Sequence, residues 1–138
     1  MTGFTCGVWP ARRLGCHLVA VVVDEDGRAQ PPLLVERSAE GAWSLLAHLD
    51  AAVGLDYDLV LPHWLARSDS LARFALERGN AAWLVPAPII EAVRVVAHLA
   101  TGPPARTAAA LARLPLAPAL RMHLRRVTPP PKNQLTLL

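Results

Sequence analysis

Carboxylates are the side chains of this chain that come closest to a pattern for metal-dependent chemistry. Asp24, Glu25 and Asp26 are consecutive, and Asp56 and Asp58 flank a tyrosine. Hard oxygen ligands of this kind hold the metal ions of enzymes that cut phosphodiesters. The first group, however, lies in a turn, where adjacent side chains point in different directions, and the second group begins a strand. A solvated hairpin tip and strand-capping groups are therefore the favoured interpretations.

The histidines and cysteines form no recognisable metal-binding or nucleophilic motif. The histidines are scattered, at His17, His48, His63, His98 and His123. None has the His-x-x-His or Cys-x-x-Cys spacing of a zinc site, and the pair Cys16-His17 lacks a third ligand nearby. The chain also lacks a phosphate-binding glycine loop and a Gly-x-Ser-x-Gly elbow. Cys6 and Cys16 fit a reduced cytoplasmic protein, although a bridge between neighbouring strands stays open.

The basic residues dominate the last third of the chain. Residues 92–138 carry seven basic side chains and no acidic one, whereas residues 1–91 carry all 11 acids and the other seven basic residues. A surface of one sign attracts an anionic partner, and the DNA backbone is the obvious candidate. Arginines that solubilise a helical segment rich in Ala and Leu explain the pattern equally well. The candidate nucleic-acid-binding residues are Arg106, Arg113, Arg121, Arg125, Arg126 and Lys132.

The last five residues form an apolar segment behind three consecutive prolines. These residues are Gln134, Leu135, Thr136, Leu137 and Leu138. The prolines favour an extended stalk, and large apolar residues are unusual in a solvated tail. The segment therefore either packs on its own domain as an edge strand or is presented to a partner. It resembles the pentapeptide Gln-Leu-Ser/Asp-Leu-Phe, with which bacterial replication and repair proteins bind the DNA sliding clamp, although Thr136 is a mild change and Leu138 replaces the commoner Phe.

Short apolar runs alternate with helical patterns, which predicts an α/β fold. Strands are expected at 4–9, 17–23, 32–37, 57–61 and 81–85. Helices are expected at 39–52, from a cap at Ser68 or Asp69 to Arg78, and at 89–100, 107–114 and 119–127. This order is typical of the ribonuclease H-like fold, in which three antiparallel strands and then parallel strands form a mixed five-stranded sheet with flanking helices. We expect one domain over 1–127, with a C-terminal helical extension, and a linker and tail over 128–138.

Several stretches within residues 3–115 resemble known nucleic-acid enzymes. They include Gly7-Val8-Trp9-Pro10-Ala11-Arg12, the strand that ends in Asp24-Glu25-Asp26-Gly27, and Arg106-Thr107-Ala108-Ala109-Ala110-Leu111-Ala112. These stretches resemble the RuvC-like domains of DEDD-type transposases, and the last is similar to Lys-Thr-Asp-x-x-Asp-Ala. Arg13-Leu14-Gly15 and Ala29-Gln30-Pro31 also resemble the YqgF-like resolvases.

The resemblance implies two metal ions held by carboxylates, and the expected ligand positions are not acidic here. Those positions are Trp9, Pro62 or His63, Ala108 and Leu111. Apolar side chains at these positions would fill a metal pocket, and no acid follows Glu91. We therefore expect a pseudo-nuclease with no catalytic residue, metal or cofactor. His63-Trp64 could stack on a base or a partner, although a tryptophan buried in the core is the favoured interpretation.

These features predict a non-catalytic accessory protein of DNA replication or repair, whose tail binds the sliding clamp and whose body binds DNA or another replication or repair protein. The alternative is a divergent RuvC-like nuclease or a transposase-derived enzyme, with Asp24, Glu36 and Asp58 as the nearest ligand set. The longest apolar run, at 18–23, is too short to span a membrane, and residues 1–14 do not resemble a signal peptide. A cytoplasmic, nucleoid-associated protein without membrane contact is expected.

Overall fold

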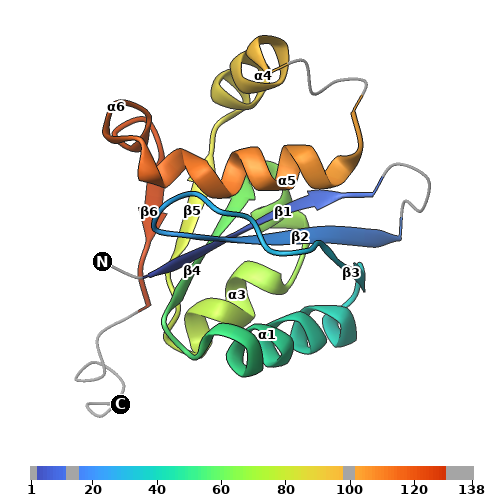
Figure 1. Ribbon diagram of the computed structural model, residues 1–138. Coiled ribbons are helices and arrows are strands. Elements are labelled where there is room, and N and C mark those ends of the chain that lie inside the picture. Colours follow the sequence, from blue (N-terminus) through green and yellow to red (C-terminus); the bar gives the residue numbers. More distant parts are fainter. Residues whose placement is uncertain (1–2, 12–15, 98–101, 130–138) are drawn as a thin grey trace.

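The β-branched apolar runs of the sequence form one mixed open sheet (Figure 1). The computed structural model describes residues 3–11, 16–97 and 102–129. The strands are β1 (Phe4–Pro10), β2 (His17–Asp24), β3 (Leu33–Glu36), β4 (Tyr57–Pro62), β5 (Ala82–Val85) and β6 (Arg125–Val127), in the order β3-β2-β1-β4-β5-β6. β2 is antiparallel to β1 and β3, β4 is parallel to β1 and β5, and β6 is antiparallel to β5. The expected α/β class with flanking helices is confirmed, but the sheet has six strands and not five.

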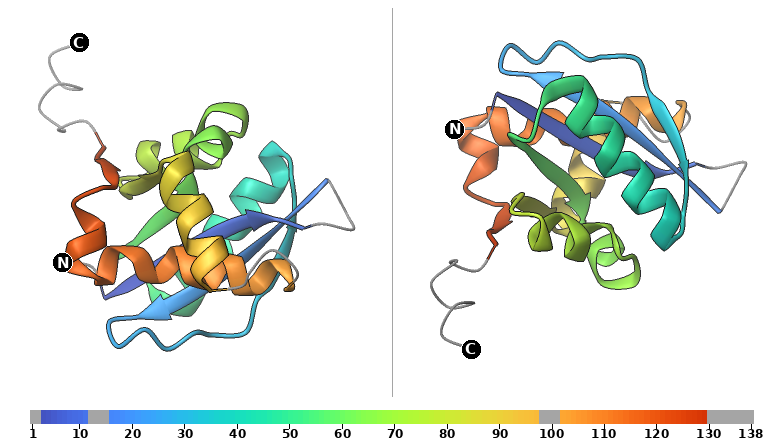
Figure 2. Two further views of the ribbon diagram at one scale, coloured as in Figure 1. Left: turned by 90° about the horizontal axis from the view of Figure 1, so that it is seen from above. Right: turned by 90° about the horizontal axis from the view of Figure 1, so that it is seen from below.

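Helices cover both faces of this sheet (Figures 1 and 2). They are α1 (Ala39–Val53), α2 (His63–Ser68), α3 (Leu71–Glu77), α4 (Ala87–Val96), α5 (Pro104–Arg113) and α6 (Pro118–Arg121), with a 3-10 turn at Leu114–Leu116. α1 and α3 lie on one face, α5 crosses the other face, and α4 lies on the outer side of α5. No helix within the described residues is long and apolar enough to cross a membrane.

Local signals in the sequence account for the turn and the helix start that frame the first part of the sheet. The carboxylate of Asp24 accepts a hydrogen bond from the backbone N–H of Arg28 at 3.0 Å, and Gly27 has the positive φ of 80° that closes the turn. Ser38 caps α1, because its hydroxyl oxygen accepts from the backbone N–H of Gly41 at 3.0 Å. Both features were predicted, and both are confirmed.

The helix predicted over 119–127 is wrong in its second half. α6 ends at Arg121, and residues 125–127 form β6 against β5. The pairing gives the last parallel strand a second hydrogen-bonded neighbour, which outweighs the local helical preference of the sequence. The helix predicted to begin at Ser68 or Asp69 is also different. Two helices, α2 and α3, meet there, and Asp69 between them has extended backbone.

Apolar side chains alternate along the strands and form a core on each face of the sheet. Cys6 and Val8 of β1 are fully buried on the side of α1 and α3, together with Leu45, Leu46 and Leu49 of α1. Each buried leucine contributes about 1.5–3 kcal/mol to folding. On the opposite face, Val19, Val21 and Val23 of β2 pack against the alanines of α5. The small side chains of α5 allow that helix to approach the sheet closely.

One residue of the expected apolar face of α1 departs from this pattern. Trp43 is 43% exposed, whereas Leu46 and Leu49 are buried as predicted. The Trp43 ring stacks on Phe74 of α3, with 4.5 Å between ring centroids. Trp43 therefore joins α1 to α3 at the surface and does not enter the core.

Candidate functional site

Two tryptophans meet at the ends of β1 and β4, where the resemblance to nucleases places metal ligands. Trp9 lies near the end of β1 and Trp64 lies in the first turn of α2, directly after β4. Their ring centroids are 6.0 Å apart, and the rings are edge to face. The guanidinium of Arg94 lies 5.4 Å from the centre of the Trp9 ring, and that of Arg37 lies 6.0 Å from the Trp64 ring. Cation–π attraction stabilises this cluster of aromatic rings and guanidinium groups.

The expected C-terminal metal ligands are replaced by apolar residues of α5. Ala108 is fully buried and Leu111 is 1% exposed. Trp9 packs against the same apolar cluster as Leu111 and Val60 of β4. The structure therefore brings the positions expected for the first-strand and C-terminal ligands together, and apolar volume fills the space between them. Trp64 is 36% exposed and is not the core residue that was favoured.

Two polar atoms near this region have no hydrogen-bond partner. Within the described residues, Nδ1 of His63 and Nε of Arg94 are buried and unpaired. Such atoms are rare in folded proteins, and each carries a desolvation cost unless an ordered water or ion completes it. His63 is one of the two positions at which an acidic ligand was expected, and it is the first residue of α2.

Asp58 is the buried carboxylate of the sheet, and its contacts are structural. Its side chain is 6% exposed and accepts hydrogen bonds from the indole N–H of Trp83 at 3.0 Å and from Nε and Nη2 of Arg126 at 3.3 Å. The Arg126 guanidinium also lies 5.6 Å from the Trp83 ring centre. Asp58 therefore joins β4 to β5 and β6, and it pairs in register with Thr5 near the start of β1, away from Trp9.

The alternative ligand set of Asp24, Glu36 and Asp58 is not brought together. Asp24 ends β2 and binds the backbone of its own turn. Glu36 pairs in register with His17, which is at the opposite end of β2. Among the residues that the structure describes, no three His, Cys, Asp or Glu side chains are grouped so that they could hold a metal ion.

The candidate nucleic-acid-binding arginines do not form one patch. Arg106 and Arg113, both on α5, line a hollow of about 400 Å³, and Arg113 also donates to the Gly27 carbonyl at 2.9 Å. Arg126 is bound to Asp58 and shares a hollow of about 370 Å³ with Arg121. Arg125 points to the other face of β6 from Arg126, because neighbouring strand residues alternate. Lys132 lies outside the described residues.

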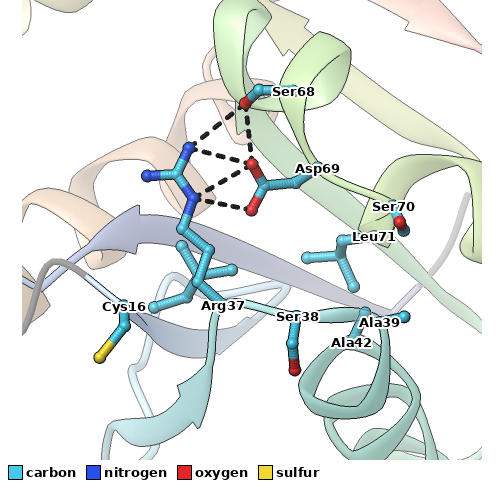
Figure 3. A pocket seen from close by; sticks show the side chains of 10 residues that line it. Cys16, Arg37, Ser38, Ala39, Ala42, Ser68, Asp69, Ser70 and Leu71 are labelled. Carbon is cyan, nitrogen blue, oxygen red and sulfur yellow. Dashed lines mark hydrogen bonds and ion pairs between the residues drawn. The ribbon is translucent and has the colours of Figure 1, made fainter.

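A polar pocket lies at the start of α1 (Figure 3). The Arg37 guanidinium binds both carboxylate oxygens of Asp69 at 3.0–3.1 Å and contacts Ser68 at 3.3 Å, so its charge is compensated. Cys16 borders this pocket, but its sulfur points away from the ion pair and lies 3.1 Å from Nδ1 of His17. Cys16 is exposed and Cys6 is buried, and both are free thiols. Burial raises the pKa of Cys6 to about 12.

An apolar groove opens on the face of the sheet that carries α1 and α3. This β5–β6 groove has a volume of about 630 Å³ and is bounded by α2, α3, β5 and β6. Its walls include Arg67, Arg73, Leu76, Leu84, Arg125 and Val127. The sequence did not indicate this groove, because it depends on the unexpected strand β6. The charge pattern also concealed it, because Arg67 and Arg73 come from the part of the chain with a net negative charge.

The clamp-binding residues predicted in the tail, at positions 134–138, lie outside the described residues. Comparison with known proteins gives no family assignment: no family model matches this chain, and no curated protein matches it.

Proposed function

We propose that this protein is a non-catalytic accessory factor of DNA replication or repair, with a degenerate RuvC-like body and a tail that binds the bacterial sliding clamp. The observation that carries the non-catalytic part is the packing of Trp9 and Leu111 in one apolar cluster at the expected metal positions. Two-metal phosphodiester chemistry needs carboxylates there to hold the ions. Tryptophan, alanine and leucine supply no such ligand.

The arrangement of the first five strands supports the relation to ribonuclease H-like domains. β3, β2 and β1 are antiparallel neighbours, and β4 and β5 continue the sheet in parallel. α5 lies across β1, which is where the resemblance places the helix that carries the C-terminal ligands. β6 is an addition to that five-stranded pattern.

The sequence of the tail supports the clamp as the partner. Gln134 would bond backbone groups through its amide, and Leu135, Leu137 and Leu138 would enter an apolar groove of the clamp. Each leucine contributes about 1.5–3 kcal/mol on burial, and ordering a free tail costs about 1 kcal/mol or more per residue. The net affinity is therefore on the order of micromolar. A second contact by the body would strengthen attachment by effective concentration.

The clamp proposal is tested with a peptide of residues 128–138 and with the full chain. Both should bind a purified bacterial sliding clamp in fluorescence anisotropy, and the double variant Gln134→Ala/Leu137→Ala should remove binding. Gln30→Ala/Leu34→Ala is the matched control in the full chain, because both residues are exposed on the body. Binding that survives the tail substitutions, or that is lost equally in the control, would refute the proposal.

The enzymatic alternative is tested separately with labelled branched and single-stranded DNA in the presence of Mg²⁺ or Mn²⁺. The non-catalytic proposal expects no metal-dependent cleavage. Cleavage that disappears in Asp24→Asn or Asp58→Asn, while circular dichroism shows an intact fold, would establish an enzyme with ligands that the present geometry keeps apart.

A further inference from the structure

The β5–β6 groove has an apolar floor. Leu84 of β5, Leu76 and Ala72 of α3, and Val127 of β6 supply apolar surface around a volume of about 630 Å³. α1 and α3 cover the same face of the sheet closer to its centre, and in the described part of the chain no helix follows α3 over β6 (Figure 2). The groove is therefore an open position in a layer of helices that pack on a sheet. Helices fit such positions with their apolar side toward the strands.

The charges at the groove are all positive. Arg67, Arg73 and Arg125 line it, together with His63 and His123, and no acidic residue is among its lining residues. Arg73 has a long, exposed contact of 4.0 Å with Glu77 on its own helix. Within the described residues, the guanidinium groups of Arg67 and Arg125 form no ion pair and no hydrogen bond.

Arg67 and Arg125 differ in this respect from arginines elsewhere in the molecule whose charge is compensated by an acidic residue. Arg37 binds Asp69 and Arg126 binds Asp58. Arg78 likewise binds Asp50. Arg67 and Arg125 therefore leave uncompensated positive charge around an apolar floor. An occupant that is complementary to both must carry carboxylates on the two sides of an apolar stripe.

We propose that the β5–β6 groove binds an acidic amphipathic helix of a partner protein. The apolar stripe of that helix would cover Leu76 and Leu84, and its flanking carboxylates would pair with Arg67 and Arg125. His63, whose Nδ1 is buried and unpaired, is also among the residues that line this groove. This inference is independent of the clamp proposal, because it uses none of residues 130–138.

The probe is a synthetic helical peptide of about 18 residues, or about five turns, with leucines on one face and glutamates on both sides of them. A second peptide has lysines in place of the glutamates. In anisotropy titrations with the full chain, the Leu/Glu peptide should bind and the Leu/Lys peptide should not. The variant Arg67→Glu/Arg125→Glu should bind the Leu/Glu peptide about tenfold or more weakly than the original protein does. It should bind the Leu/Lys peptide instead.

The matched control is Arg28→Glu/Arg106→Glu, which reverses two exposed charges away from the groove. This control variant should have the same affinity for each peptide as the original protein. Failure of the Leu/Glu peptide to bind, or equal weakening by the control variant, would overturn the proposal. The clamp-binding assay is unaffected by these outcomes, so failure of one proposal is distinguishable from failure of the other.

Three other occupants of the groove would each give a different experimental result, and each of these results would overturn the assignment to a partner helix. Deletion of residues 130–138 that raises the affinity of the Leu/Glu peptide about tenfold would assign the groove to the tail of the chain itself. A dimer in sedimentation that Arg67→Glu/Arg125→Glu dissociates would assign it to a second copy. Duplex DNA that binds the groove with a steep salt dependence, and that displaces the peptide, would assign it to nucleic acid.

Discussion

A Cβ atom on Gly7 would lie 1.9 Å from the carbonyl oxygen of Ala108. Helix α5 therefore rests directly on the backbone of β1, with no side chain between them. Real Cβ contacts are never this short, and the obstacle is backbone and not a movable side chain. This contact places Ala108 and Leu111 against the strand that also carries Trp9.

Gly7→Ala should therefore destabilise the fold. The added methyl group forces α5 away from β1, and overpacking of this kind costs about 1–3 kcal/mol. Urea denaturation followed by circular dichroism measures the loss. Gly3→Ala is the matched control, because its Cβ would be 3.5 Å from the Glu25 side chain, an ordinary contact. Equal stability of the two variants would show that α5 does not contact β1 as described.

The ion pair between Asp58 and Arg126 should be measurable as a coupling energy. Arg126→Ala removes two hydrogen bonds from a carboxylate that is 6% exposed, so it should cost about 1–3 kcal/mol. Asp58→Ala releases an arginine that is 42% exposed and that water can solvate. A double-mutant cycle in thermal denaturation should give a coupling of about 0.5–3 kcal/mol. Additive effects of the two substitutions would show that the pair does not contribute to the attachment of β6.

Local pattern was sufficient to predict β1 to β5 and α1. The run at 17–23 is apolar and β-branched, the turn after it carries Asp-Gly, and Ser38 precedes a helical period. Each of these signals operates within a few residues, so the sequence reveals it directly. β6 is different, because three residues containing two arginines give no strand pattern. Its pairing with β5 and the bond from Arg126 to Asp58 form only in the folded chain.

The candidate sites were harder to predict than the fold, for the same reason. Replacement of the expected ligand by Trp9 is visible in the sequence, but its contacts with Trp64 and Arg94 depend on how α2 and α4 are placed. The β5–β6 groove joins Arg67 of α2 to Arg125 of β6, which are far apart in the chain. The charge pattern of the sequence places Arg67 and Arg125 in different parts of the chain, whereas the fold brings them to one groove.

Stability should fall at alkaline pH because two acidic groups are buried in their neutral forms. Burial raises the pKa of the Cys6 thiol from 9.0 to about 12. Burial, and then the nearby Cys6 charge, raise the pKa of the Tyr57 hydroxyl from 10.0 to about 12. The unfolded chain loses these protons first, so their stabilisation is complete below pH 9 and is lost as the pH rises toward 12. The slope is about 1.4 kcal/mol per pH unit for each group.

Two cysteine variants test this dependence in urea titrations between pH 7 and 11. Cys6→Ala should lower stability at every pH, because it leaves a small cavity, and should remove most of the decline between pH 9 and 10. Cys16→Ala should keep the decline of the original protein, because Cys16 is exposed. An unchanged slope in Cys6→Ala would mean that the Cys6 thiol does not stay protonated in the folded state.

Deletion of residues 134–138 should show whether the tail binds a partner or packs on its own domain. If the tail binds the sliding clamp, the shortened chain should melt within about 1 °C of the full chain, since exposed segments contribute little to stability. If the tail pairs with the body as an edge strand, it would bury three leucines, and the loss of even 1 kcal/mol would lower the melting temperature by about 3–6 °C in a domain of this size. Differential scanning calorimetry distinguishes these values. A large decrease, together with unchanged affinity for the clamp, would mean that the tail belongs to the fold and that the clamp proposal is wrong.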